Sequence, residues 1–239
     1  MFDLWPLFVN TLLQYLGMKN KTALAFDFDG TLADSTNLEL KTMCDTIRLF
    51  GTLKLDKDSD LEKYYGPTEE GIIKEFVPPD RFEEAWAFFL NEYRTLSKEL
   101  LGKPFDGMDE LLSKYHQKNN ILKVLITGRS RPTLDISLTD IGLAAYFDKC
   151  YTGSEKGVNK DQSIESLLHD YGLEKEDVIY IGDTETDIKT MRKAGIDIIS
   201  AVYAYPKEYQ ERIDRLNPSK VAHSVKELET LLDLATKKD

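Results

Sequence analysis

The sequence predicts an α/β fold: a parallel sheet with helices on both faces, interrupted by an insert that is helical throughout. Two observations support this. Over residues 103–239, short apolar runs typical of buried strands alternate with helical patterns, and strands that alternate with helices pair in parallel. Residues 36–102 show helical patterns and no strand pattern. The chain therefore has the length and pattern of one core domain that carries an insert.

The first strand is expected at residues 23–26, and Asp27, Asp29 and Gly30 follow it directly. Side chains two positions apart in a strand point to the same side, so both carboxylates lean toward one point. Glycine at position 30 permits a sharp turn and a close backbone approach to a ligand. Neighbouring carboxylates repel each other unless a cation or a shared proton lies between them. The strand end therefore predicts a metal site.

A calcium loop of the helix–loop–helix kind is excluded at this position. Such a loop requires an oxygen ligand at its fifth position, glycine at its sixth and glutamate at its twelfth. Counted from Asp27, these positions are Thr31, Leu32 and Leu38. A polar turn after a strand stays open on these residues alone.

The insert is expected to contain three helices, separated by turn signals at Gly66-Pro67 and Pro78-Pro79. Aromatic residues recur along the last helix and are most simply explained as the core of the insert. The expected helices cover residues 37–50, 69–76 and 81–101.

From residue 103 onward, predicted strands alternate with predicted helices. Gly172 suits a helix C-terminal cap, and Ser224 with Glu227 forms a capping box that opens the final helix. Strands are expected at 122–127, 148–152, 177–182 and 196–202, and helices at 108–115, 131–141, 163–171, 187–193 and after residue 224.

Polar residues end three of the expected strands: Asp27 with Asp29, then Thr127, then Asp183. Ligands of parallel sheets bind at the carboxyl ends of the strands, so these residues belong to one site. Asp183 and Asp187 offer the hard oxygen ligands that Mg²⁺ prefers. For Asp187, a helix-start residue favoured by the helix dipole is the open alternative.

The composition excludes several partners. The net charge of −11 argues against nucleic acid and anionic membranes. Cys44 and Cys150 are too few for a disulfide framework, which favours the cytoplasm. Residues 1–20 predict an amphipathic helix that packs on the main domain, with a dimer or peripheral membrane contact as the alternative. The chain is expected to be a monomer or a homodimer.

These motifs resemble the haloacid dehalogenase superfamily of phosphotransferases. The resemblance covers the chain after residue 20 and extends to the phosphoglycolate phosphatase branch through Leu32-Ala-Asp34-Ser35, Pro104-Phe-Asp-Gly107 and Ala194-Gly195. It implies a Rossmann-like core over 21–35 and 103–239 and a helical cap over 36–102. The matching motifs are Asp27-Phe-Asp29-Gly30-Thr31, Thr127, a lysine, and Gly182-Asp183-x-x-x-Asp187.

The resemblance also implies a mechanism. Asp27 attacks the phosphorus of a monoester, and Asp29 protonates the leaving alcohol and then activates water. Thr127 and the Gly128 amide hold phosphoryl oxygens. The implied cofactor is Mg²⁺, and its implied ligands are Asp27, the carbonyl of Asp29, Asp183 and, less directly, Asp187.

The phosphate-binding lysine is assigned to Lys160, because it opens directly into the following helix, with Lys156 as the alternative. Proline often follows this lysine in the branch, whereas Asp161 follows here. Arg129 and Arg131 are expected to solvate a loop, with contact to a second anionic group of the substrate as the alternative. Candidate specificity residues of the cap are Tyr64, Tyr65, Thr68 and Lys74.

The expected function is therefore a Mg²⁺-dependent phosphatase, a phosphoric monoester hydrolase acting on a small phosphorylated metabolite such as phosphoglycolate or a sugar phosphate. A sugar phosphomutase of the same superfamily is the alternative. Mutases commonly carry a branched apolar residue where this chain has Thr31, which favours the phosphatase. A dehalogenase is disfavoured, because it has no use for Asp29 as an acid or for a metal.

Overall fold

The computed structural model describes residues 21–154, 157 and 159–237, and its centre is a six-stranded sheet. All neighbouring strands pair in parallel, in the order β3-β2-β1-β4-β5-β6. The predicted Rossmann-like parallel sheet is thus confirmed. The strands are β1 (Ala23–Phe26), β2 (Leu122–Ile126), β3 (Lys149–Tyr151), β4 (Val178–Gly182), β5 (Asp197–Ala201) and β6 (Val221–Ala222).

The two central strands, β1 and β4, are buried along their whole length. Their side chains alternate between two hydrophobic clusters, one on each face of the sheet, as the two-residue period of a strand requires. A sheet buried on both faces is typical of parallel strands linked by helices. One cluster contains Leu24, Phe26, Ile179 and Ile181, and the other contains Ala23, Ala25, Val178 and Tyr180.

Helices of the core cover both faces of the sheet. Buried residues of α5 (Met108–His116), α6 (Arg131–Asp140) and α10 (Val225–Ala235) join the first cluster. Buried residues of α7 (Lys160–Tyr171), α8 (Glu185–Ala194) and α9 (Lys207–Leu216) join the second. Short 3-10 turns lie at Asp58–Tyr64, Pro79–Arg81, Ala144–Tyr146 and Lys175–Asp177.

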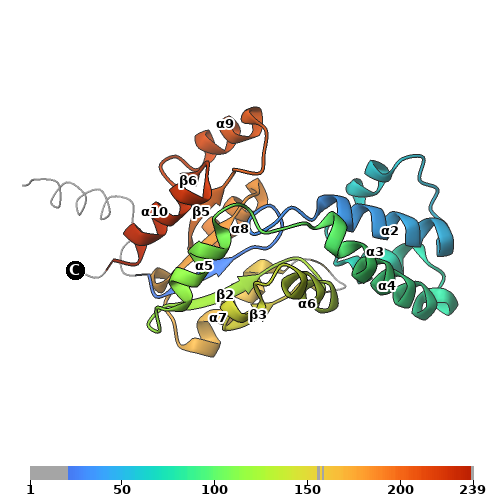
Figure 1. The fold of residues 1–239 in the computed structure, drawn as a ribbon, viewed down its shortest axis with the longest axis horizontal. Helices are drawn as coiled ribbons and strands as arrows, with labels where there is room; N and C mark the ends of the chain where they lie inside the picture. The colour runs from blue at the N-terminus through green and yellow to red at the C-terminus, as the bar shows by residue number, and fades with distance from the viewer. Residues whose placement is uncertain (1–20, 155–156, 158, 238–239) are drawn as a thin grey trace, which may run out of the picture.

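The segment between β1 and β2 is helical up to α5, as the sequence predicts. Figure 1 shows α2 (Thr36–Phe50), α3 (Glu69–Phe76) and α4 (Phe82–Leu100) together at one end of the molecule, beyond the strands. Stacked aromatic rings along α4, such as Trp86 on Phe89 at 5.1 Å between centroids, form part of their shared core.

Several element boundaries differ from the predictions. Helix α7 begins at Lys160 rather than at residue 163, and α8 begins at Glu185 rather than at Asp187. Two elements have no clear signal in the sequence: α9 is polar and buries only Ile213, and β6 is only two residues long. The predicted helix over 1–20 lies outside the described residues. Within the described part of the chain, no helix has the length and apolar character needed to cross a membrane.

Candidate active site

A cavity of about 390 Å³ lies where the carboxyl ends of β1 and β4 face the helices of the insert. The core contributes Asp27, Asp29, Gly128, Lys160 and Asp183 to its lining. The insert contributes residues of α2, of α3 and of the loop that precedes α3. The residues that follow the strands and those of the insert therefore share one site.

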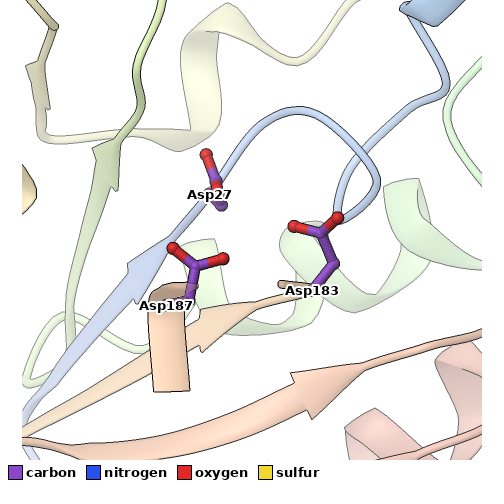
Figure 2. Close-up of side chains that lie close together, drawn as sticks. All are labelled: Asp27, Asp183 and Asp187. Atoms are coloured by element: carbon purple, nitrogen blue, oxygen red, sulfur yellow. The ribbon is translucent and has the colours of Figure 1, made fainter. Parts of the chain in front are cut away.

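Three aspartates lie close together at the wall of this cavity, and two of them, Asp27 and Asp183, line it (Figure 2). Ligand oxygens of Asp27, Asp183 and Asp187 all lie within 4.8 Å of one another. Asp27 follows β1 and Asp183 follows β4, and these strands are neighbours in the sheet, so the two carboxylates lie side by side. Asp187 joins them from the first turn of α8, where it also completes a capping box with Thr184.

Lys160 is the first residue of α7, and its ammonium group lies between two of these carboxylates. Its Nζ donates hydrogen bonds to Asp27 Oδ2 and to Asp187 Oδ1, the latter at 2.6 Å. The structure therefore brings Lys160 into the site, as the sequence predicts. Lys156, the alternative, lies outside the described residues.

The three carboxylates carry more negative charge than one ammonium group offsets. Burial raises the pKa of Asp27 to about 6, although Lys160 counteracts the shift. Burial, together with the charges of Asp27 and Asp187, raises the pKa of Asp183 well above its ordinary value. Burial would also raise the pKa of Asp187, but Lys160 and the hydrogen bonds of Thr184 outweigh it, so that pKa is lowered. A further cation bound between these carboxylates would reduce the repulsion among them.

The residues present fit a Mg²⁺ ion. Asp183 Oδ1 is buried and has no hydrogen-bond partner among the described residues, while Oδ2 accepts a hydrogen bond from Tyr205. A buried, unpaired carboxylate oxygen beside two further carboxylates is a hard donor set suited to Mg²⁺. Because position 30 is glycine, the backbone of the loop after β1 can lie close to the Asp183 carboxylate; a Cβ at this position would lie 2.3 Å from Asp183 Oδ2. The carboxylate of Asp29 lies outside this cluster.

Asp29 instead forms an ion pair with Arg129. Nε of Arg129 lies 3.0 Å from each carboxylate oxygen of Asp29, and Nη2 lies 2.8 Å from Oδ1. Nη1 donates to Tyr93 of α4 and, at 3.2 Å, to Ser137 of α6. Nη2 also lies 2.6 Å from Glu39 of α2.

The expectation that Arg129 solvates a loop is therefore wrong, because Arg129 is 2% exposed. Its acceptors come from segments far apart in the sequence, and no local pattern signals their meeting. Arg131 behaves as expected: it is exposed and pairs with Asp135 on its own helix at 2.8 Å.

Of the predicted phosphate-binding pair, Gly128 lines the cavity. Thr127 is buried and is not among the lining residues, and its Oγ1 accepts a hydrogen bond from the backbone N–H of Arg129 at 3.3 Å. A Cβ at Gly153 would lie 2.3 Å from the Gly128 carbonyl oxygen, so glycine at 153 lets the chain after β3 approach this loop.

A buried glutamate joins the insert to the core. Glu69 opens α3, and its carboxylate accepts hydrogen bonds from Ser130 N at 2.8 Å and from Thr133 Oγ1 at 2.6 Å, both at the start of α6. Of the candidate specificity residues, Tyr65 and Thr68 line the cavity. Tyr64 packs on Phe76 instead, and Lys74 pairs with Glu70.

Comparison with known proteins shows the family. A family model described as haloacid dehalogenase-like hydrolase matches residues 24–201. The chain is 24% identical to pyrophosphatase PpaX of Halalkalibacterium halodurans over 85% of this chain and 93% of that one. It is 26% identical to phosphoglycolate phosphatase of Aquifex aeolicus over 77% and 86% of the two chains.

Solved structures agree on the fold. A predicted phosphoglycolate phosphatase of Haemophilus somnus superposes with a TM-score of 0.71, at 16% identity, over 90% of this chain and 99% of that one. A predicted phosphatase of Clostridium acetobutylicum gives a TM-score of 0.65 at 25% identity over the same shares. The family and the names of the relatives confirm the expected class of enzyme, a phosphatase. The chain belongs to the haloacid dehalogenase-like hydrolase family.

Proposed function

We propose that this chain is a Mg²⁺-dependent phosphatase that hydrolyses a small phosphate monoester through an aspartyl-phosphate intermediate. One observation carries the proposal: ligand oxygens of Asp27, Asp183 and Asp187 lie within 4.8 Å of one another, Asp27 and Asp183 line the cavity, and Asp183 has an unpaired oxygen among the described residues. The relatives named phosphatase and pyrophosphatase support the same class of reaction.

In the proposed reaction, a carboxylate oxygen of Asp27 attacks the phosphorus, and the bond from phosphorus to the alcohol oxygen breaks. Asp29 gives its proton to the departing alcohol. Water then attacks the phosphorus of the aspartyl-phosphate, and Asp29 takes the proton from that water. The second step releases phosphate and restores the Asp27 carboxylate and the protonated Asp29.

The other residues would stabilise the charge that moves in these steps. Lys160 donates a hydrogen bond to Oδ2 of Asp27, and the backbone N–H of Phe28 donates one to Oδ1 at 2.7 Å, so both oxygens of the proposed nucleophile are held in place. Gly128 lines the cavity at the strand end and would bind a phosphoryl oxygen through its amide. Mg²⁺, held by Asp27, Asp183, Asp187 and the carbonyl of Asp29, would offset the repulsion between the phosphate and the carboxylates.

We further propose that residues 36–102 act as a cap on a core of residues 21–35 and 103–239. The cavity between them supports this division, because a cap that closes over it would exclude water from the aspartyl-phosphate. The cysteine content supports the cytoplasm as the compartment. A monomer or a homodimer would suit a cavity built within one chain.

The test is phosphate release from p-nitrophenyl phosphate, with Mg²⁺ or with EDTA, by the natural protein and by Asp27→Asn. We expect turnover that requires Mg²⁺ and that vanishes in Asp27→Asn. Asp135→Asn is the matched control, because Asp135 is an exposed aspartate that pairs with Arg131 on the surface. Retained turnover in Asp27→Asn would exclude Asp27 as the nucleophile. Interconversion of sugar phosphates without phosphate release would favour the mutase instead.

A further inference from the structure

The part of the cavity that the insert forms is neutral or acidic. This is the side that faces the leaving group in the proposed reaction, and its described lining residues carry no positive charge. Apolar, hydroxyl and amide groups make up most of it, and two carboxylates complete it. These residues are Thr36, Glu39, Met43, Tyr65, Gly66, Pro67, Thr68, Glu69 and Ile72.

Among the described residues that line the whole cavity, the basic ones are Arg129 and Lys160. Arg129 has no donor left for a substrate, because each guanidinium nitrogen already faces an acceptor. Nε and Nη2 bind Asp29, and Nη1 binds Tyr93 and Ser137. Glu39 provides a second carboxylate, 2.6 Å from Nη2.

Lys160 is committed to the other end of the cavity. Its ammonium group already pairs with Asp27 and Asp187, beside the point where the phosphoryl group would react. It therefore offsets part of the negative charge of the aspartates and is not available to the leaving group.

Acidic side chains outnumber basic ones in the lining of the cavity. Six described lining residues are acidic and two are basic. In the proposed reaction Mg²⁺ would balance the phosphate dianion, so a second anion on the substrate would find no unpaired cationic side chain among the described lining residues. A carboxylate placed in a partly buried cavity without a cation loses its hydration and gains no partner. The acidic lining residues are Asp27, Asp29, Asp34, Glu39, Glu69 and Asp183.

We propose that the leaving group of the substrate is an uncharged alcohol and that the cavity selects against esters with a second anionic group. The inference rests on the proposed phosphatase function. The phenol of Tyr65 and the hydroxyl groups of Thr36 and Thr68 suit a hydroxylated leaving group, and Met43 and Ile72 suit its carbon skeleton. Phosphoglycolate and pyrophosphate, from which two relatives take their names, both have anionic leaving groups.

The test compares 2-hydroxyethyl phosphate with 2-phosphoglycolate, two esters of nearly equal size that differ in a terminal CH₂OH or carboxylate. With Mg²⁺ present, we expect kcat/KM for the hydroxyethyl ester to exceed that for phosphoglycolate at least about tenfold. Pyrophosphate is expected to fall below the hydroxyethyl ester as well. Equal or better hydrolysis of phosphoglycolate or pyrophosphate would overturn the inference and leave the phosphatase function intact.

A variant places a cation on the insert wall. Thr36 is exposed, begins α2 and lines the cavity, so Thr36→Lys adds an ammonium group without disturbing the core. We expect the ratio of kcat/KM for phosphoglycolate to that for the hydroxyethyl ester to rise about tenfold. Asn37→Lys is the matched control, because it adds the same charge on the same helical turn at an exposed residue outside the lining.

The outcomes separate the two proposals. An unchanged ratio in Thr36→Lys, or an equal rise in Asn37→Lys, would overturn the inference. If the natural protein hydrolyses none of the three compounds, 2-hydroxyethyl phosphate, 2-phosphoglycolate and p-nitrophenyl phosphate, the proposed function is overturned, and the inference with it.

Discussion

The guanidinium group of Arg129 holds both carboxylate oxygens of Asp29, with Nε 3.0 Å from each. The same guanidinium contacts Glu39 of α2 and Tyr93 of α4. The proposed acid–base residue is therefore oriented by an arginine that is itself held by the insert. Docking of the insert and orientation of the catalytic carboxylate are coupled through this one side chain.

Replacing Arg129 by lysine tests this coupling. Lysine keeps the charge but cannot make the planar, two-point contact with a carboxylate. For an alkyl phosphate we expect kcat/KM to fall about 100-fold, since general acid catalysis contributes on this scale and kcat/KM reports only the steps up to formation of the aspartyl-phosphate. For p-nitrophenyl phosphate we expect a much smaller loss of kcat/KM, because its leaving group departs without a proton. The measurement is kcat and KM of Arg129→Lys for ethyl phosphate and p-nitrophenyl phosphate.

Arg131→Lys is the control for this prediction, because Arg131 is exposed and pairs with Asp135 on its own helix. Equal losses of kcat/KM on both substrates in Arg129→Lys would show that Arg129 supports the fold of the site rather than the acid.

A methyl group at position 30 is expected to weaken Mg²⁺ binding. Gly30 has φ +69°, and a Cβ there would lie 2.3 Å from Asp183 Oδ2, so Gly30→Ala must displace that carboxylate. We expect Mg²⁺ affinity to fall about 10- to 100-fold, the range found when a metal ligand loses its support. Isothermal titration with Mg²⁺ measures it.

Gly142→Ala separates this effect from backbone strain. Gly142 has φ +77°, and a Cβ there would meet no atom within 4 Å, so the variant carries the strain without the clash. We expect it to lose about 1–2 kcal/mol of stability and to keep its Mg²⁺ affinity. A matching loss of Mg²⁺ affinity in both variants would contradict the role of Gly30.

Glu69→Gln is expected to loosen the insert. The carboxylate of Glu69 accepts two hydrogen bonds at the start of α6, whereas an amide carries no charge and has only one oxygen to accept with, so both charge-assisted bonds cannot be kept. A lost hydrogen bond to a buried charged group corresponds to about 1.5–3 kcal/mol, so we expect KM to rise about tenfold and proteases to cut the insert faster. Steady-state kinetics and limited proteolysis measure both effects.

Glu70→Gln provides the comparison, because Glu70 occupies the next position of α3 and pairs with Lys74 on the surface. Similar changes in the two variants would show that the charge of α3, and not the contact with α6, controls the insert.

The ion pair between α5 and α10 predicts a pH dependence of stability. The hydrogen bond from Lys114, followed by that from Lys226, lowers the pKa of Glu229 from 4.5 to about 2. A lowered folded-state pKa contributes stability above pH 4.5, and that contribution is lost as the pH falls toward 2. We expect Glu229→Gln to lower Tm at pH 7 and the difference from the natural protein to shrink between pH 4.5 and 2.

Thermal unfolding across this pH range measures the effect. Glu110→Gln, at an exposed position of α5, is expected to leave Tm nearly unchanged at every pH. A Tm difference for Glu229→Gln that stays constant with pH would rule out the ion pair as its cause.

The sequence by itself determined the fold class and the residues at the strand ends. Short apolar runs, the two-residue period of strands and the parallel pairing that follows from alternating helices are local signals. They suffice to bring Asp27 and Asp183 to one edge of the sheet. Lys160 was predictable in the same way, because the start of a helix after a strand opens at that edge.

Only the tertiary structure decided how the site is completed. The sequence predicts that Arg129 is a solvated loop residue, yet its side chain is buried and bonded to acceptors on α2, α4 and α6. In the sequence, Glu69 likewise looks like an ordinary glutamate of a first helical turn. Only the structure shows that it accepts a hydrogen bond from Ser130 at the start of α6. Such contacts join residues tens of positions apart, and their geometry depends on how the insert packs on the core. No local pattern encodes that packing, because it follows from the burial of the whole insert at once.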